Sequence, residues 1–164
     1  MKYILALLNS KLFFLWLSYK GKRKGDMLEL YQKPLSEIPI IFSSEMISFE
    51  RLIVTVLFTK SKSQINDKVK NEHIYNFLQE VIDGCVFELY FEQHMKEKEI
   101  NIIDDVKNCL KKSGINEDFE SLSEETKKQK TWELYKEMST GIIQIKMTDF
   151  ITKSPDILKP ILQS

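Results

Sequence analysis

The chain has 164 residues, and its 24 Lys and Arg residues balance its 24 Asp and Glu residues, so the formal net charge is zero. This length is typical of one domain with a substantial core. A net charge of zero excludes a protein whose whole surface is basic. The charge is uneven, however. Residues 1–42 hold seven bases and three acids, a net of +4, which leaves −4 on residues 43–164. A locally basic element on a near-neutral body is therefore expected.

The beginning of the chain predicts one buried helix over residues 3–19, because its apolar residues recur at helical spacing on two faces. We expect Leu7, Phe14 and Leu17 to form an exposed apolar patch or a self-association surface, since the chain offers little sheet to cover them. The polar stretch 9–11 interrupts the apolar run, which is too short to span a bilayer and lacks a signal-peptide cleavage site. A cytoplasmic protein without a membrane segment is predicted.

Glycine and proline punctuate the next segment. Gly21 is expected to end the first helix in a left-handed cap, and residues 27–31 are expected to form a short strand. Pro34 and Pro39 exclude a long helix, so residues 32–42 predict turns and extended chain.

The rest of the chain predicts mostly helices. Apolar residues at helical spacing indicate helices over residues 45–60, 68–91 and 101–112, and a capping box at Ser121 and Glu124 precedes a polar helix. An alternating pattern predicts a strand over residues 142–147, and Ser154-Pro155 predicts the start of a last short helix. The predicted fold class is mainly α (α+β), a helical bundle with a few short strands.

The pattern is cleanest over residues 68–91, where four apolar residues are expected to line the buried stripe: Phe77, Val81, Cys85 and Leu89. His73 and His94 are expected to lie outside this stripe. Cys85 and Cys109 are the only cysteines, and they are compatible with two buried thiols in a reducing compartment or with one disulfide.

Catalytic motifs are missing from the sequence. It contains no Gly-rich phosphate loop, no nucleophile elbow and no zinc-ligand spacing. His73 and His94 are interpreted as solvated or helix-end histidines, and Glu88, Glu92 and Glu97 as a solvated acidic face. No catalytic residue and no metal site is predicted for this chain, and a stand-alone enzyme is the least supported function.

The strongest chemical feature is the basic turn "GKRKG" between Gly21 and Gly25. Its cations and the polar residues that follow are candidate DNA-binding residues: Lys20, Lys22, Arg23, Lys24, Gln32 and Lys33. Lysine and arginine on such a turn neutralise phosphates, and Arg23 has the geometry to read a guanine edge. An ordinary solubilising turn is the alternative interpretation.

Two stretches resemble a known family. The first, "YILALLNSKLFFLWLSYKGKRKG…LYQKPLSEIPI", is similar to the end of a TaqI-like specificity domain, in which "llNSkl", a Gly-containing turn and "iPi" follow one another. The residues that carry this match are Leu7, Leu8, Asn9, Ser10, Lys11, Leu12, Gly21, Gly25, Leu35, Ile38, Pro39 and Ile40. The second stretch, "FLQEVIDGCVFELYFEQHMKEKEINII", resembles a segment near the C-terminus of fused restriction-modification enzymes of type IIG. Its match is carried by Asp83, Val86, Glu88, Leu89, Tyr90 and Phe91.

The resemblance implies a larger parent enzyme with a nuclease region, an adenine-N6 methyltransferase and a C-terminal target-recognition region. Residues 1–42 would be the end of the specificity domain, with a first helix left from a truncated domain, and residues 43–164 a helical region packed on it. S-adenosylmethionine and Mg²⁺ are implied only for the parent, because the Asn-Pro-Pro-Tyr type of methyltransferase motif is absent. A fragment, a separate subunit and a gene remnant all fit this pattern.

Two functions follow from these observations. The resemblance implies a non-catalytic DNA-binding portion whose partners are double-stranded DNA and the methyltransferase and nuclease parts of the parent. The alternative is a helical scaffold or protein-interaction module that makes no DNA contact of its own. The two differ in salt dependence, because phosphate contacts weaken steeply with salt and apolar interfaces do not.

Overall fold

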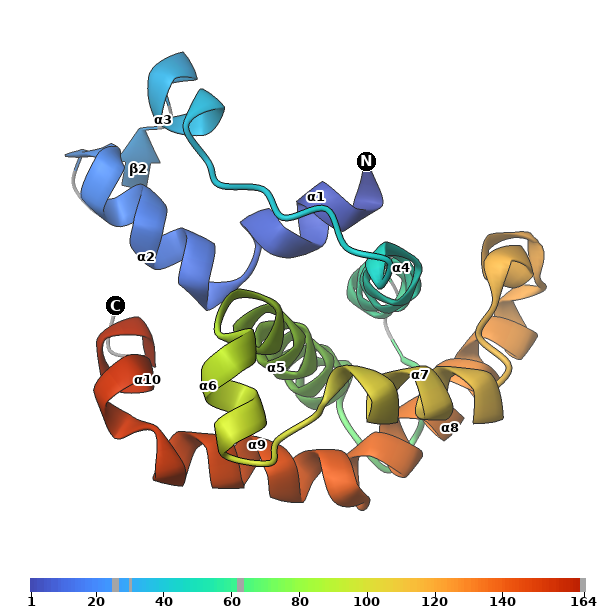
Figure 1. The fold of residues 1–164 in the computed structure, drawn as a ribbon. Helices are drawn as coiled ribbons and strands as arrows, with labels where there is room; N and C mark the ends of the chain where they lie inside the picture. The colour runs from blue at the N-terminus through green and yellow to red at the C-terminus, as the bar shows by residue number, and fades with distance from the viewer. Residues whose placement is uncertain (25–26, 30, 62–63, 163–164) are drawn as a thin grey trace.

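The computed structural model is mainly α, as the sequence predicts (Figure 1). It describes residues 1–24, 27–29, 31–61 and 64–162, without the side chains of Arg23, Lys24, Met27, Leu28, Pro34, Glu117 and Leu162. The elements in chain order are α1 (Lys2–Leu8), α2 (Lys11–Lys20), β1 (Lys22–Lys24), β2 (Met27–Glu29), α3 (Gln32–Ser36), α4 (Met46–Ser61), α5 (Asn71–Tyr90), α6 (Glu92–Glu97), α7 (Ile103–Lys112), the 3-10 turn η1 (Glu117–Ser121), α8 (Glu124–Ser139), α9 (Ile142–Lys153) and α10 (Pro155–Leu162).

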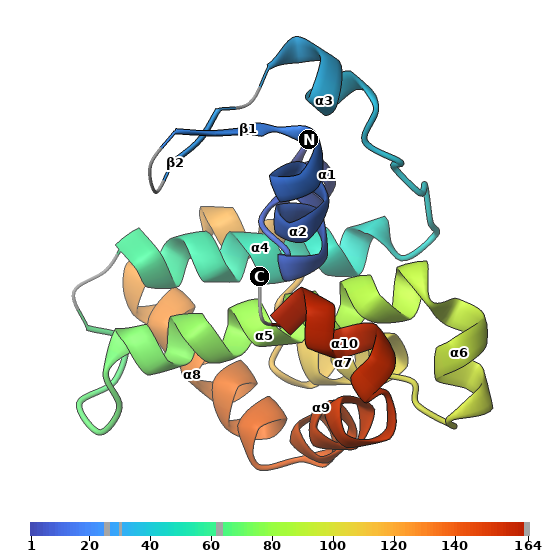
Figure 2. The same cartoon turned by 90° about the vertical axis from the view of Figure 1, so that its left-hand side faces the viewer.

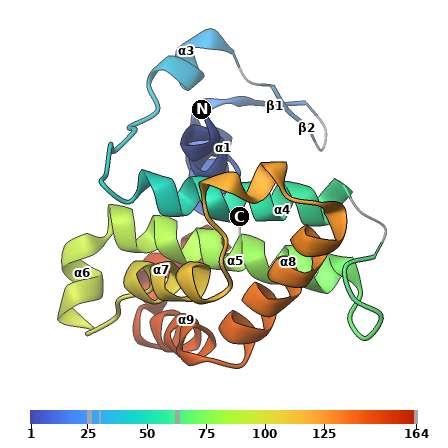
Figure 3. The same ribbon diagram turned by 90° about the vertical axis from the view of Figure 1, so that its right-hand side faces the viewer.

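The long helix α5 lies at the centre of the bundle. It packs against α4 on one side and against α8 and α9 on the other, while α2 and α6 contact it near its C-terminal half. Every residue from Val81 to Phe87 is buried. Figures 2 and 3 show α1 and α2 stacked beyond α4, with β1, β2 and α3 forming the outermost layer on that side.

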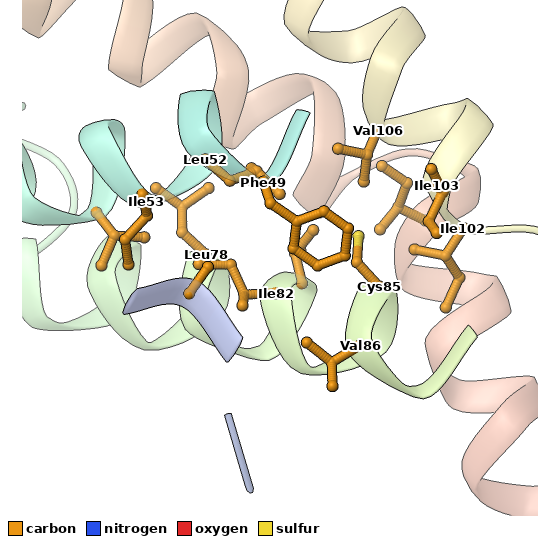
Figure 4. Packing of buried hydrophobic residues seen from close by; sticks show 14 of the residues in the cluster. Phe49, Leu52, Ile53, Leu78, Ile82, Cys85, Val86, Ile102, Ile103 and Val106 are labelled. Atoms are coloured by element: carbon orange, nitrogen blue, oxygen red, sulfur yellow. The ribbon is translucent and has the colours of Figure 1, made fainter. Parts of the chain in front are cut away.

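The hydrophobic core lies where α4, α5 and α7 meet (Figure 4). Each helix contributes apolar residues three or four positions apart, as a helix with one buried face requires. The buried side chains at this junction include Phe49, Leu52, Ile53, Leu78, Ile82, Cys85, Val86, Ile102, Ile103 and Val106. Burial of roughly ten such side chains, at about 1.5–3 kcal/mol each, is the main favourable term that holds these helices together.

The long helices follow the sequence predictions closely. In the predicted helix over residues 101–112, the apolar residues at helical spacing are all buried, namely Ile102, Ile103, Val106, Cys109 and Leu110. Pro155 is the first residue of α10, as predicted. In α5, Val81 and Cys85 are buried while Phe77 and Leu89 are half-buried. Both cysteines are buried free thiols. Met27–Glu29 forms the expected strand, and Leu30 lies outside the described residues.

The N-terminal helix is not continuous, which corrects the sequence prediction. The helix is interrupted after α1. The Ser10 side chain caps the start of α2 by accepting a hydrogen bond from the Phe13 N–H. This break turns Leu7 and Leu17 into the fold, where they are 0% and 5% exposed. The expected apolar patch is therefore wrong for these two residues, and Phe14 alone is exposed, at 47%.

Residues 142–147 form the start of α9 and not a strand. An alternation only six residues long also fits a helix, because Ile143, Met147 and Phe150 fall on one face at spacings of four and three. Ile145, which the strand would place beside Ile143, is 60% exposed. A longer run of apolar residues would distinguish the two-residue period of a strand from the 3.6-residue period of a helix, but six residues are too few.

Local details of three other elements also differ from expectation. Gly21 does end α2, but its φ and ψ of −84° and 177° are extended and not left-handed. The cap of α8 is Ser123, whose hydroxyl accepts from the Thr126 N–H, while Ser121 ends η1. In α4, Leu57 is 45% exposed although its spacing from Ile53 would place it on the apolar face of the predicted helix.

We predict that Val81→Asp unfolds the protein, because Val81 is 0% exposed and a carboxylate there has no partner. An unpaired buried charge costs about 3–5 kcal/mol or drives the side chain out of the core. Asn76→Asp, which adds the same charge on the exposed face of α5, is the matched control. Thermal melting monitored by circular dichroism measures both, and equal melting temperatures would show that the buried stripe of α5 is assigned to the wrong face.

Candidate nucleic-acid interface

The position of α2 is set by a buried carboxylate of α5. Asp83, 3% exposed, accepts a hydrogen bond from the Lys11 N–H at 2.8 Å, and the Lys11 Nζ lies 4.0 Å from its other oxygen. A second hydrogen bond runs from the Gln79 side chain to the Asn9 carbonyl at 3.2 Å. The free N–H groups of a helix N-terminus favour an acceptor of negative charge, so Asp83 holds the first turn of α2 against the body.

Burial changes the chemistry of this carboxylate. Removal from water raises the pKa of Asp83 from 3.8 to about 6, although the hydrogen bond and charge of Lys11 act in the opposite direction. Its neighbour Ser10 is also fully buried, and the Ser10 hydroxyl donates to the Leu7 carbonyl at 2.7 Å. The polar pair Ser10 and Asp83 thus satisfies the backbone where α1 ends and α2 begins.

Tyr90, at the end of α5, holds the extended segment that follows α3. Its hydroxyl donates to the Pro39 carbonyl at 2.6 Å and accepts from the Ile41 N–H at 3.2 Å. The Tyr3 hydroxyl of α1 donates to the Ile41 carbonyl, and burial raises the pKa of Tyr3 to about 12. The segment around Pro39 is therefore tied to the body from two sides.

Glu88 has a comparable structural role, which corrects its interpretation as part of a solvated acidic face. Its carboxylate accepts from the N–H groups of Ile102 and Ile103 at the start of α7, at 2.5 Å and 2.9 Å. Burial raises the pKa of Glu88, and the two backbone hydrogen bonds partly oppose that rise. The two stretches that carry the family resemblance therefore meet in space, because Asp83 contacts the first stretch and Tyr90 its end.

The basic turn forms an antiparallel hairpin beyond α2. Strands β1 and β2 pair with Lys22 opposite Glu29, Arg23 opposite Leu28 and Lys24 opposite Met27. The hairpin and α3 both contact α2, and Figure 2 shows them projecting away from the helical body. The edges of an isolated strand pair carry unpaired backbone N–H and C=O groups, to which another molecule can hydrogen bond.

The structure places the predicted DNA-binding residues around the end of α2. Lys20 is in its last turn, Lys22 is exposed on β1, and Gln32 and Lys33 are exposed on α3. Arg23 and Lys24 have described backbone in β1, while their side chains lie outside the described part. Five of the six predicted positions thus lie in the outer layer of β1 and α3, and Lys20 lies at the end of α2 that this layer contacts.

Two acids moderate the charge of this layer. The Lys20 Nζ lies 3.9 Å from a Glu37 oxygen and 5.9 Å from the centre of the Trp16 ring. Glu29 accepts a hydrogen bond from the Tyr31 hydroxyl, which raises the pKa of Tyr31. Lys20 and Glu37 are both exposed, and an exposed ion pair of this kind contributes about 0–1 kcal/mol.

No catalytic arrangement is found among the residues that the structure describes. His73 is exposed, and the His94 ring nitrogen Nε2 lies 2.7 Å from the buried Ser154 hydroxyl. Across the described ranges, no group of three His, Cys, Asp or Glu side chains could hold a metal ion. None of the described helices combines the length and apolar character needed to cross a bilayer.

The sequence is similar to parts of restriction-modification enzymes. Over 114 residues it is 31% identical to the type II methyltransferase M.HincII of Haemophilus influenzae, covering 70% of the chain and 17% of the methyltransferase. Type II methyltransferase M.HindII of Haemophilus influenzae shares the same 31% identity over 114 residues, which are 70% of the chain and 16% of that protein.

A third relative is RM.MjaORFECS2P of Methanocaldococcus jannaschii, whose name describes a type II restriction enzyme and methyltransferase. It is 31% identical over 117 residues, 67% of the chain and 9% of the relative. No protein-family model and no solved structure matches. The chain is therefore related in sequence to one part of type II restriction-modification methyltransferases, and the matched part is about a sixth or less of each relative.

We predict that Asp83 makes folding stability increase on acidification. Its folded pKa of about 6 lies above the ordinary value of 3.8, so the folded state binds the proton more tightly than the unfolded state between these values. This contribution is fully present below pH 4 and is lost as the pH rises through 6. Asp83→Asn keeps an oxygen for the Lys11 N–H but removes the titration.

Urea denaturation at pH 7 and pH 4 tests this prediction. The wild type should gain roughly 2 kcal/mol relative to Asp83→Asn on going to pH 4. The other titrating groups are common to both proteins and cancel in the difference. A constant difference between the two proteins across this range would mean that Asp83 keeps an ordinary pKa in the folded state.

Proposed function

We propose that this chain is the DNA-binding target-recognition portion of a restriction-modification methyltransferase of the type IIG class, cytoplasmic and non-catalytic by itself. The observation that carries the proposal is the 31% identity over 70% of the chain to two type II methyltransferases. The resemblance to a TaqI-like specificity domain in residues 1–42 supports target recognition in particular.

In this proposal the hairpin contacts the DNA backbone. The cations of Lys20, Lys22 and Lys33 are exposed around the end of α2, where each can replace a counterion at a phosphate. Arg23 would read a guanine edge through its two parallel donors, and Gln32 would make a further polar contact. The extended segment tied down by Tyr90 keeps α3 and the hairpin in a fixed relation to the body.

The chemistry of the reaction belongs to the rest of the parent enzyme. S-adenosylmethionine would supply the methyl group there, and Mg²⁺ would serve its nuclease part. The chain has no Asn-Pro-Pro-Tyr type of motif, and its described residues provide no metal-ligand cluster. The division into a specificity part at residues 1–42 and a supporting helical part at residues 43–164 follows the same proposal.

A helical scaffold without DNA contact is the second candidate function. It is favoured by the exposed aromatic side chains of α2, which are available for an apolar interface. Phe14 and Tyr19 on α2, 47% and 81% exposed, would then contact the catalytic part or a second copy of the chain. Salt dependence of DNA binding separates this function from the first.

We predict that replacing Lys22, Arg23 and Lys24 by Gln weakens duplex binding and lowers the salt slope by up to ~0.9 per lost phosphate contact. Melting should barely change, because the hairpin lies in the outermost layer of the fold and away from the hydrophobic core. Fluorescence anisotropy with labelled duplex at several salt concentrations measures the effect. In a reconstituted parent enzyme, methylation should fall while S-adenosylmethionine binding is unchanged.

The control is a variant with the same loss of charge elsewhere, in which Lys98, Lys111 and Lys159 are replaced by Gln. These three lysines are exposed on α6, α7 and α10 or directly beside them. If the hairpin variant and the control bind duplex equally and with equal salt slopes, the hairpin is not a DNA contact. The scaffold function would then be favoured.

A further inference from the structure

A small cavity lies where α5, α9, the start of α7 and the first turn of α2 meet, at the opposite end of α2 from the hairpin. Its volume is about 130 Å³, and its apolar wall includes Phe87 and Phe150, whose ring centres are 5.8 Å apart, together with Ile102 and Met147. Cofactor sites usually occupy roughly 300–1,000 Å³, whereas an apolar cavity of about 150 Å³ holds one benzene-sized molecule. This cavity therefore has room for one ring-sized group and not for a nucleotide.

Gly84 helps to shape the wall of this cavity. It lies inside α5, where glycine is less favourable than alanine for helix stability. A Cβ atom at this residue would lie 3.1 Å from the Ile102 Cδ1 and 3.6 Å from the Met147 Cγ. The first distance is shorter than an ordinary van der Waals contact, so a side chain here would press on the cavity wall. The glycine thus allows α5 to approach these two residues closely.

The Asp83 carboxylate lines the same cavity and is only partly satisfied by the fold. The residue is 3% exposed, and its Oδ1 atom accepts the hydrogen bond from the Lys11 N–H at 2.8 Å. Its Oδ2 atom lies 4.0 Å from the Lys11 Nζ, which is too far for a hydrogen bond. Across the described residues, no other group donates to Oδ2. A carboxylate accepts at both oxygens, so one buried acceptor remains for a donor that enters the cavity.

The charges around the cavity favour a cation as this donor. Glu80 and Asp83 are the acids that line it and Lys11 is the base, which gives a formal charge of −1. The Lys11 side chain is 48% exposed, so water solvates its ammonium group. Asp83, with a pKa of about 6, is mostly ionised at pH 7. A cationic N–H group would give Oδ2 a charge-assisted hydrogen bond, whereas an anion would meet a buried like charge.

We infer that this cavity binds a small organic cation, with an apolar part about the size of one ring and an N–H group that donates to the Asp83 Oδ2. The apolar part packs against Phe87, Ile102 and Phe150. Ile151 both lines the cavity and is 48% exposed, so it lies at the entrance from solvent. This binding site is separate from the hairpin, and the inference does not rest on the proposed DNA-binding function.

The test uses three probes that share one ring and differ in the group that would meet Asp83. Benzylamine is a cation at pH 7, benzyl alcohol is a neutral donor, and benzoate is an anion. Each is titrated into the isotope-labelled full chain and followed by the NMR shifts of the backbone amides. Benzylamine should shift the amides of Gly84, Phe87 and Phe150 and bind roughly tenfold more tightly than benzyl alcohol, because a hydrogen bond between charged groups is the stronger one. Benzoate should not bind.

Substitution of the carboxylate tests its part in binding. Asp83→Asn keeps an oxygen for the Lys11 N–H and should weaken benzylamine binding roughly tenfold or more, with little effect on benzyl alcohol. Glu72→Gln removes an exposed acid of the same helix outside the cavity lining and is the charge-matched control. It should bind both probes as the wild type does.

A second variant tests the location without altering Asp83. Ile151→Trp places a larger side chain at the entrance and should abolish binding of benzylamine and benzyl alcohol. Ile145→Trp is its control, because Ile145 is 60% exposed on the same helix and does not line the cavity. Benzylamine that binds Ile151→Trp and the wild type equally, or no more tightly than benzyl alcohol or benzoate, would overturn the inference. A titration in which the cavity amides do not shift would overturn it as well.

Discussion

The hydrogen bond from the Lys11 N–H to the buried Asp83 carboxylate determines how the N-terminal part of the chain sits on the helical body. Helix α5 is buried on every side between Val81 and Phe87, so a polar side chain there needs a hydrogen-bond partner within the protein. Asp83 finds it in the first turn of α2, and α2 in turn carries the hairpin and α3. The orientation of the basic layer thus depends on one carboxylate placed inside an apolar helix.

The same arrangement recurs at the C-terminal end of α5. Glu88 receives the first N–H groups of α7, and Tyr90 holds the extended chain around Pro39. These hydrogen bonds fix the positions of the segments more than they add stability. Each contributes little net free energy to folding, but a buried polar group that loses its partner costs considerably more. One helix therefore fixes three other segments, and the two stretches that resemble restriction-modification enzymes are in contact because of it.

Any attraction of this protein to a polyanion must come from the distribution of its charges, because its formal net charge is zero. The neutral chain gathers an excess of cations in its first 42 residues, while acids predominate in the rest. Phosphate contacts act over about one Debye length, roughly 8–10 Å in physiological salt, so local excess matters more than the sum.

The sequence by itself determined the helices of α4, α5 and α7 and the basic turn, because periodicity, prolines and charge clusters act over a few residues. It predicted Pro155 as a first-turn residue for the same reason, but it joined α1 and α2 and made a strand of residues 142–147. Tertiary structure decided these points, since the partner of Lys11 lies 72 residues away and α9 buries Ile143 and Phe150 in a helix that contacts α5 and α8. Apolar spacing is a local property, whereas the capping of a helix by a distant carboxylate exists only once the chain has folded.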